Sequence, residues 1–275
     1  MSQTLSPEGI RRALHTRWAG QGTIFYAPEM DSTNTRLKAE ARGGAPHGSL
    51  ALCEMQTAGR GRLDRSWETP RGEALTHSLL LRPTLPVDQA QLCTLAAALA
   101  MTRAIRECCP GLCPGIKWPN DVVIGSRKCV GVLSEMSATA AGIEFVITGV
   151  GLNVNQLSFP DTLSDKATSL LMELRRQDPD HPPLSRQALL CAYLQHMEQV
   201  MEAVEKQGFA GIREEYAACS VTIGRRVQVL SPAETFVGLA MQVDDTGALL
   251  VETEQGQLRQ VLCGDVSVRG LMGYV

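Results

Sequence analysis

The sequence predicts an α+β protein in two parts, a larger domain over residues 1–219 and a small β domain over residues 220–275. Short apolar runs rich in valine and isoleucine, separated by glycine and proline, are typical of strands in one sheet. Two longer stretches repeat apolar residues at intervals of three and four, which predicts helices with one buried face. After about Ser220 the runs become short and alternating, with the turns DDTG and EQG between them, as in a small antiparallel barrel.

The same patterns predict the individual elements of the first domain. Three capping candidates, Asp31, Ser32 and Thr33, precede apolar residues at helical spacing and indicate a short helix. The expected helices cover residues 31–44, 92–109 and 185–206. The expected strands cover residues 22–28, 48–59, 74–83, 115–125, 128–137 and 143–155. A segment rich in arginine therefore connects two strands.

The composition is that of a globular protein. Of the 275 residues, 44% are hydrophobic and 20% are charged, and the formal net charge is -3. The longest uncharged apolar run, residues 92–102, is too short to span a bilayer, so no membrane partner is expected. The N-terminus lacks the order of basic and apolar residues of a secretory signal, which predicts a cytoplasmic protein. The near balance of charge argues against non-specific nucleic-acid binding.

The nine cysteines are scattered, and their only close cluster is Cys108, Cys109 and Cys113. A structural metal site needs a second pair of cysteines, or histidines at ligand spacing, and neither follows. We therefore expect reduced thiols and no structural zinc.

The arginine-rich segment AGRGRLDRSW carries Arg60, Gly61, Arg62 and Arg65. Glycine lets the backbone approach a ligand closely, and guanidinium groups bind carboxylate or phosphate in a planar, bidentate way. The segment matches neither the phosphate loop GxxxxGK[ST] nor the dinucleotide fingerprint GxGxxG before a helix. It is therefore an anion-binding candidate of another kind. The alternative is a solvated basic loop held by acidic neighbours, namely Asp64, Glu54 or Glu68.

A second candidate is the stretch GIKWPNDVVIGSRKC. Pro119 enforces extended backbone before it, and Asn120 and Asp121 supply turn chemistry. Two strands joined by a short turn would hold Lys117 and Lys128 near the same end. Phosphate transfer depends on cations placed where negative charge builds up, so the two lysines complement the arginine segment. The alternative is that Trp118 and Pro119 pack in the core and both lysines lie at the surface.

Two further motifs have equally good structural explanations. The sequence GVGLNVN, residues 149–155, ends an apolar strand, where glycines indicate either close approach of a ligand or a plain turn. In MDSTN, residues 30–34, a role as helix cap already explains Asp31 or Ser32 without any further function. The five histidines stand apart from any GxSxG motif, which argues against a hydrolytic triad.

In order along the chain, DSTN, QTAGRGRLDRSW, KWPNDVVIGSRKCVGVLSE and GVGLNVN, followed by a small β domain, resemble the biotin protein ligase family. The resemblance runs from about residue 22 to the C-terminus. It implies a mixed β-sheet with flanking helices, related to the catalytic core of class II aminoacyl-tRNA synthetases, and a C-terminal SH3-like barrel. It also implies two reaction steps. Biotin and Mg-ATP give biotinyl-5'-AMP and pyrophosphate, and the acyl group then moves to a lysine of a biotin carboxyl carrier protein domain.

The resemblance also implies roles for individual residues. Arg60, Gly61 and Arg62 would fold over biotin and the adenylate, and Lys117 would contact the biotin carboxyl group or the α-phosphate. Lys117 and Arg62 are thus the expected catalytic residues. The expected substrate-binding residues are Ser32, Thr33, Asn34, Gln56, Arg60, Gly61, Arg62 and Lys117. Weaker candidates are Lys128, Trp67 on the adenine side, Asn120, Asp121 and Asn153. Mg2+ would arrive with ATP, and Asp121 is considered as its protein ligand.

The chain departs from the family pattern at three places. Asp64 stands where a glycine is usual, and Thr76 and His77 follow the loop where an aromatic residue is common. Only about twenty residues precede the first expected strand, so we expect the monofunctional type, without the N-terminal DNA-binding domain and without operator binding. Members of the family often dimerise through the edges of their sheets, so the resemblance is compatible with a homodimer.

Two alternatives remain. Lipoate or octanoate ligases share the superfamily and a reactive-site lysine, but the combination of GRGR with KWPND is not expected in them. A phosphate- or nucleic-acid-binding module, with the arginine loop on phosphates, is a different class. It predicts nucleic-acid binding that weakens with salt. The logarithm of the binding constant should fall with the logarithm of the salt concentration, with a slope of about one for each phosphate contact.

Overall fold

The computed structural model describes residues 4–63, 65–231, 234–263 and 267–270. Asp64, one of the departures from the family pattern, lies outside the described residues. The helices of the larger part are α1 (Pro7–Ala13), α2 (Thr33–Arg42), α3 (Leu92–Cys108), α4 (Leu170–Gln177), α5 (Arg186–Gln207) and α6 (Arg213–Cys219). Two short 3-10 helices cover Val87–Gln89 and Gly208–Gly211. None of the described helices is long and apolar enough to cross a membrane.

A seven-stranded sheet forms the centre of the larger part. Its strands are β1 (Ile24–Met30), β2 (Leu50–Gln56), β3 (Ala74–Leu81), β4 (Pro114–Lys117), β5 (Asp121–Ile124), β6 (Arg127–Thr139) and β7 (Gly142–Asn153). They lie in the order β1-β2-β3-β7-β6-β5-β4, and β1 runs parallel to β2 while every other neighbour is antiparallel. The expected mixed sheet with flanking helices is therefore confirmed.

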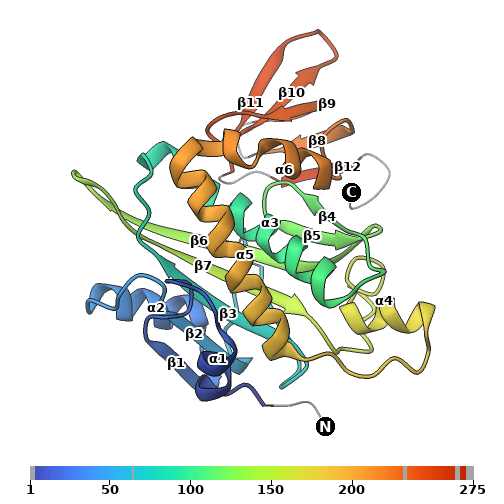
Figure 1. Cartoon of the computed structure of the whole chain (residues 1–275). Helices are drawn as coiled ribbons and strands as arrows, with labels where there is room; N and C mark the ends of the chain where they lie inside the picture. Colours follow the sequence, from blue (N-terminus) through green and yellow to red (C-terminus); the bar gives the residue numbers. More distant parts are fainter. Residues whose placement is uncertain (1–3, 64, 232–233, 264–266, 271–275) are drawn as a thin grey trace.

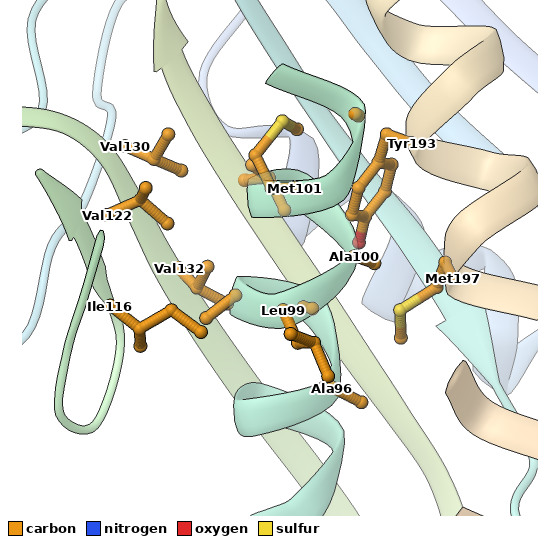
Figure 2. Close-up of a cluster of buried hydrophobic side chains, with 14 of the residues drawn as sticks. Ala96, Leu99, Ala100, Met101, Ile116, Val122, Val130, Val132, Tyr193 and Met197 are labelled. Carbon is orange, nitrogen blue, oxygen red and sulfur yellow. The ribbon is translucent and has the colours of Figure 1, made fainter. Parts of the chain in front are cut away.

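The helices divide the two faces of this sheet. Figure 1 shows α3 and α5 side by side across one face, with the C-terminal strands beyond their ends. In Figure 2, Leu99 and Met101 of α3 lie between Val130 and Val132 of β6 and Tyr193 of α5, so α3 is enclosed on both sides. This explains why α3 is apolar almost all round rather than along one stripe.

On the opposite face, α2 covers only one end of the sheet. Leu37 and Ala41 of α2 pack on Leu80, Phe145 and Ile147 in a second, smaller core cluster. The remainder of this face, on β3, β7 and β6, is left to the arginine-rich segment. The sheet thus has a closed face for stability and a partly open face for ligands.

The C-terminal part is a five-stranded antiparallel sheet. Its strands are β8 (Arg226–Leu230), β9 (Thr235–Val243), β10 (Leu249–Thr253), β11 (Leu258–Val261) and β12 (Ser267–Gly270), in the order β11-β10-β9-β8-β12. Alternate residues such as Val227 and Val229 are buried, as the sequence pattern requires. The architecture agrees with the expected SH3-like barrel. The division into domains at residue 219, where α6 ends, stays a prediction.

Most expected elements are present, and three differences have physical reasons. Strand β1 continues through Pro28 to Met30, because an edge strand tolerates a residue without an N–H donor. The run 115–125 folds into two strands, β4 and β5, since the turn at Pro119 reverses the chain. Helices α1, α4 and α6 escaped the sequence analysis because seven or eight residues are too few for a recognisable apolar stripe.

Candidate active site

The open face of the sheet has a floor built from small residues. In one row across the strands, Thr76 of β3 pairs with Gly151 of β7, which pairs with Gly131 of β6. A Cβ atom at Gly151 would lie 2.3 Å from the Trp67 ring, and one at Gly149 would lie 2.1 Å from the Asn34 amide oxygen. Glycine is therefore required at both positions for the neighbouring side chains to reach the backbone.

A pocket lies on this floor and brings together most of the residues predicted from the sequence. Its walls come from α2, from the arginine-rich segment and from strands β3, β6 and β7. The predicted residues that line it are Ser32, Thr33, Asn34, Gln56, Arg60, Gly61, Arg62, Trp67, Asn120 and Lys128. These residues are up to about a hundred positions apart in the chain, so the sheet order rather than the sequence assembles the pocket.

One end of the pocket is a neutral hydrogen-bonded wall. Ser32 caps α2 by accepting a bond from the Thr35 N–H, which fixes where the helix begins. The Thr33 N–H donates to the Gln56 side-chain oxygen at 2.8 Å. Ser78 Oγ lies 2.8 Å from Thr33 Oγ1 and 2.6 Å from Asn34 Oδ1. Sequence analysis missed Ser78; the two-residue alternation of β3, which places it on the same face as Thr76, could have found it.

The arginine-rich segment closes over the pocket and is anchored at several points. Arg62 donates to Asn120 Oδ1 at 2.9 Å and to the Cys263 carbonyl of the C-terminal part at 3.0 Å. The Trp67 N–H bonds the Gly59 carbonyl at 2.9 Å, and the Trp67 ring lies beneath the Lys128 ammonium. The alternative of a solvated basic loop held only by acidic neighbours does not describe Arg62, which binds Asn120 and the Cys263 carbonyl.

Acidic partners of the loop also differ from those expected. Arg60 approaches Glu135 of β6 at 3.5 Å, whereas Glu54 is paired with Arg186 in the core. Glu135 lies within the motif KCVGVLSE but was not selected from the sequence, because nothing in the local pattern shows that β6 passes beside the loop.

The other end of the pocket is cationic. Lys117 is buried and, like Asp121, is not among the residues that line the pocket. Burial lowers the pKa of its ammonium to about 8 even though Asp121 opposes that shift. Lys128, Arg269 and Arg65 are the further charges that lower it. An ion pair of 2.6 Å joins Lys128 to Asp121. The alternative in which both lysines are surface residues is wrong for Lys117, which is only 7% exposed.

Asn153 has a different environment from the other candidates. Its amide donates to the Thr168 carbonyl at 3.1 Å and its oxygen accepts from Gln156. The asparagine of GVGLNVN thus holds the loop before α4 and is not among the residues that line the pocket. Its assignment to the site stays a prediction.

The two departures in β3 lie on opposite faces of the sheet. Thr76 lines the pocket, whereas His77 is fully buried on the α5 side, with its ring 4.9 Å from that of Tyr193. Burial lowers the pKa of His77 to about 3. Of these two departures only Thr76 lines the pocket, because adjacent residues of a strand point in opposite directions.

The cysteine cluster lies at the end of α3, away from the pocket. Burial raises the pKa of Cys108 to about 11 and that of Cys109 to about 12, while Cys113 is exposed. Within the described parts of the chain, no three His, Cys, Asp or Glu side chains are grouped so that they could hold a metal ion.

Comparison with known proteins now adds independent evidence. A model of the biotin/lipoate A/B protein ligase family matches residues 26–153, and a model of the biotin protein ligase C-terminal domain matches residues 222–269. A biotin–[acetyl-CoA-carboxylase] ligase of Mycobacterium tuberculosis is 33% identical over 95% of this chain and 96% of its own length. The chain belongs to the biotin protein ligase family.

Other biotin protein ligases support the same relationship. The bifunctional ligase/repressor BirA of Bacillus spizizenii is 36% identical over 96% of this chain and 79% of its own length. The structure of the Aquifex aeolicus biotin protein ligase in complex with biotin and ATP has a TM-score of 0.74 and 27% identity, covering 90% of this chain and 99% of that one. The fold and order of elements are therefore those of biotin protein ligases.

Proposed function

We infer that this protein is an ATP-dependent biotin ligase that forms biotinyl-5'-AMP and transfers biotin to a lysine of a carrier protein. The observation that carries this function is that one pocket, above a floor of glycine residues, has two chemically different ends. A neutral hydrogen-bonded wall suits an uncharged ring system, and a cationic end suits a carboxylate and a phosphate. The matching family model also includes lipoate ligases, but the M. tuberculosis relative, which is similar over 95% of this chain, is a biotin–[acetyl-CoA-carboxylase] ligase.

In the first step the biotin carboxylate attacks the α-phosphorus of ATP, the bond to the bridging oxygen breaks, and pyrophosphate leaves. Two anions must approach each other, so cations have to offset their repulsion and the charge that builds up. We assign this role to Lys117 and Arg62, with Lys128 as a further cation. Ser32, Thr33, Asn34 and Gln56 would hold the ring system of biotin.

In the second step the carrier lysine attacks the acyl carbon and AMP leaves. No enzyme nucleophile is needed, because the carboxylate and the amine both come from substrates. The loop carrying Arg60, Gly61 and Arg62 would shield the mixed anhydride from water. Trp67, packed over Gly151, would face the adenine, and Asn120 would hold Arg62 in place.

The remaining substrates and partners follow from this reaction. Mg2+ would enter with ATP as part of the substrate; Asp121, guessed as its ligand, is already paired with Lys128. The acceptor would be the biotin carboxyl carrier domain of a carboxylase, as the name of the M. tuberculosis relative implies for that protein. The cytoplasmic location, the homodimer and the absence of DNA and membrane partners stay predictions.

Biotin-dependent exchange of pyrophosphate into ATP tests the first step, with lipoate and octanoate as parallel substrates. We expect exchange with biotin alone, and labelling of a carrier domain on its lysine when the domain is added. Exchange with lipoate or octanoate instead of biotin would leave the fold assignment unchanged and show that biotin is not the substrate. Salt-sensitive nucleic-acid binding without any exchange would favour the binding module.

A further inference from the structure

Gln91, the residue before α3, uses its side chain to hold the C-terminal part. A side chain at this position commonly bonds the first N–H groups of its own helix, but that of Gln91 makes no such bond. Its Nε2 donates to the Thr246 carbonyl, and its Oε1 accepts from the Cys263 N–H at 3.2 Å. Gln91 thus joins two segments of the C-terminal part, the turn between β9 and β10 and the chain that follows β11.

The turn between β9 and β10 is held without any help from Gln91. One oxygen of Asp244 accepts from the Thr246 N–H, the Thr246 hydroxyl and the Ala248 N–H. The carbonyl of Gly247 in the same turn accepts from Trp118 Nε1 at 3.1 Å. The Thr246 carbonyl is therefore a fixed acceptor, against which the side chain before α3 can orient.

Cys263, by contrast, depends on the larger part for both of its backbone hydrogen bonds. A carbonyl can only accept, so Thr246 attracts the NH2 group of Gln91 and leaves Oε1 facing the Cys263 N–H. The Cys263 carbonyl accepts from Arg62 Nη2 at 3.0 Å. Strand β11 ends at Val261, and Cys263 has no further backbone partner among the described residues. Its side chain packs on the core, but that contact does not set the direction of its peptide groups.

We propose that Gln91 is a positioning residue that presents the Cys263 carbonyl to Arg62 and thereby keeps the arginine-rich segment closed over the adenylate. Gln91 is not among the residues that line the pocket, so it acts through Arg62 and not on the substrate. This inference rests on the proposed function, in which the segment retains biotinyl-AMP. It adds a residue outside the pocket that sets how long the intermediate is retained.

Loss of the Gln91 oxygen should affect retention and not the formation of the adenylate. The Cys263 N–H loses its partner and turns to water, so the direction of the neighbouring carbonyl is no longer fixed. Arg62 keeps its bond to Asn120 Oδ1 at 2.9 Å, and its charge stays at the pocket. The segment should therefore open more often, while the cations that stabilise the reacting phosphate remain in place.

The test compares Gln91→Met, which keeps the length of the side chain without its amide, with Gln91→Glu, whose carboxylate can still accept from the Cys263 N–H. Gln89→Met and Gln89→Glu are the matched controls, the second for the added charge. Gln89 lies two residues earlier, and its side chain makes no hydrogen bond within the part of the chain that the structure describes.

Three quantities are measured on each variant. Pyrophosphate exchange at saturating biotin reports adenylation. The half-life of bound biotinyl-AMP, after free substrates are removed, reports retention. Hydrogen exchange of the Gly61 and Trp67 amides in the ligand-free protein reports opening of the segment, because these N–H groups bond the Arg65 and Gly59 carbonyls within it.

Gln91→Met should shorten the half-life of bound adenylate about 5-fold, the effect of one lost hydrogen bond, and should speed the exchange of both amides about as much. Its pyrophosphate exchange should stay within about 2-fold of the unaltered protein. Gln91→Glu and both Gln89 variants should stay within about 2-fold in all three measurements. A lower melting temperature with all three quantities changed together would show a merely structural role and overturn the proposal.

Arg62→Ala provides a second test because it removes the contact through which Gln91 acts. Adding Gln91→Met to Arg62→Ala should then change neither the half-life nor the amide exchange any further. Full additivity, or an unchanged half-life in Gln91→Met, overturns the proposal. Absence of biotin-dependent pyrophosphate exchange in the unaltered protein would instead contradict the proposed function. Amide exchange would still show whether Gln91 holds the segment, so the two failures are distinguishable.

Discussion

The two ends of the pocket differ in how their side chains are held. At the neutral end, Ser32, Thr33 and Asn34 start a helix and Ser78 lies within a strand, so short bonds between regular elements fix every group. At the cationic end, long side chains reach in from a loop and from a hairpin. On the proposed function, the neutral end would serve recognition, where geometry must be fixed beforehand, and the cationic end would serve the charge that develops during reaction.

This comparison makes a kinetic prediction. Changes at the cationic end should lower kcat, because the interactions there are strongest in the transition state. Changes at the neutral end should raise the biotin KM and leave kcat nearly unchanged, since the ring system is held equally in both states. Four experiments test the difference, in order of decreasing effect.

Lys117→Ala should have the largest effect. Removal of one preorganised donor from a reacting phosphate lowers adenylation by about 100- to 1000-fold. Pyrophosphate exchange at saturating biotin measures it, with Lys206→Ala on α5 as the control lysine. Normal turnover in the Lys117 variant would show that this residue takes no part in the reaction.

Arg62→Gly should lower adenylation less than Lys117→Ala does, and it should in addition release the adenylate that forms. Arg62 bonds both Asn120 and the Cys263 carbonyl, so its loss detaches the loop from the hairpin turn and from the C-terminal part. We expect about a 10- to 100-fold faster escape of biotinyl-AMP, since each charge-assisted bond contributes about 1.5–3 kcal/mol. Labelling of bystander lysines reports the escape.

Arg71→Gly is the control for this experiment. It adds the same flexibility to the same connection between β2 and β3, and the contact it removes is an exposed ion pair with Glu29. Equal escape from both variants would mean that loop stiffness, and not the Arg62 contacts, retains the intermediate.

The pH dependence of kcat/KM should reveal Lys117 directly. Burial lowers its pKa from 10.5 to about 8, so the ammonium is present below about pH 8 and is lost as the pH rises through that value. Each further unit of pH should then reduce kcat/KM about 10-fold. Lys117→Arg, which stays charged, should lose this alkaline decline whatever its absolute rate. A decline that persists in the arginine variant must come from another group.

Thr33→Val should have the smallest effect and the opposite kinetic signature. It removes one neutral hydrogen-bonding group, which raises the biotin KM about 3- to 10-fold and leaves kcat within about 2-fold. Thr148→Val is the control, because Thr148 is a fully buried hydroxyl on the closed face of the same sheet. A loss of kcat in Thr33→Val would abolish the distinction between the two ends.

The sequence predicted much of this site because several of its parts are local. Ser32, Thr33 and Asn34 are adjacent in the chain, and so are Arg60, Gly61 and Arg62. The residues of each motif therefore stay close together however the rest of the chain folds. Helix caps, glycine-rich loops and the turn at Pro119 depend on a few neighbouring residues. The apolar residues at intervals of three and four in α3 and α5 likewise predicted those helices nearly to their ends.

What could not be predicted depends on contacts across strands. Glu135 and Arg269 come from two separate strands, and no local pattern indicates that they face the motif residues. The pairing of Thr76 with Gly151 and of Gly151 with Gly131 is set by register. A shift of one residue would turn every one of these side chains to the closed face.

The sequence by itself therefore determined the α+β class, the main helices and strands, and the chemistry of an anion-binding loop beside two lysines. Only the tertiary structure decided that Lys117 is buried and has a lowered pKa, that His77 faces away, and that Arg62 joins the loop to the C-terminal part. The reason is physical. Local conformation follows from neighbouring residues, whereas burial, pKa and hydrogen-bond direction follow from whatever the rest of the chain places around a group.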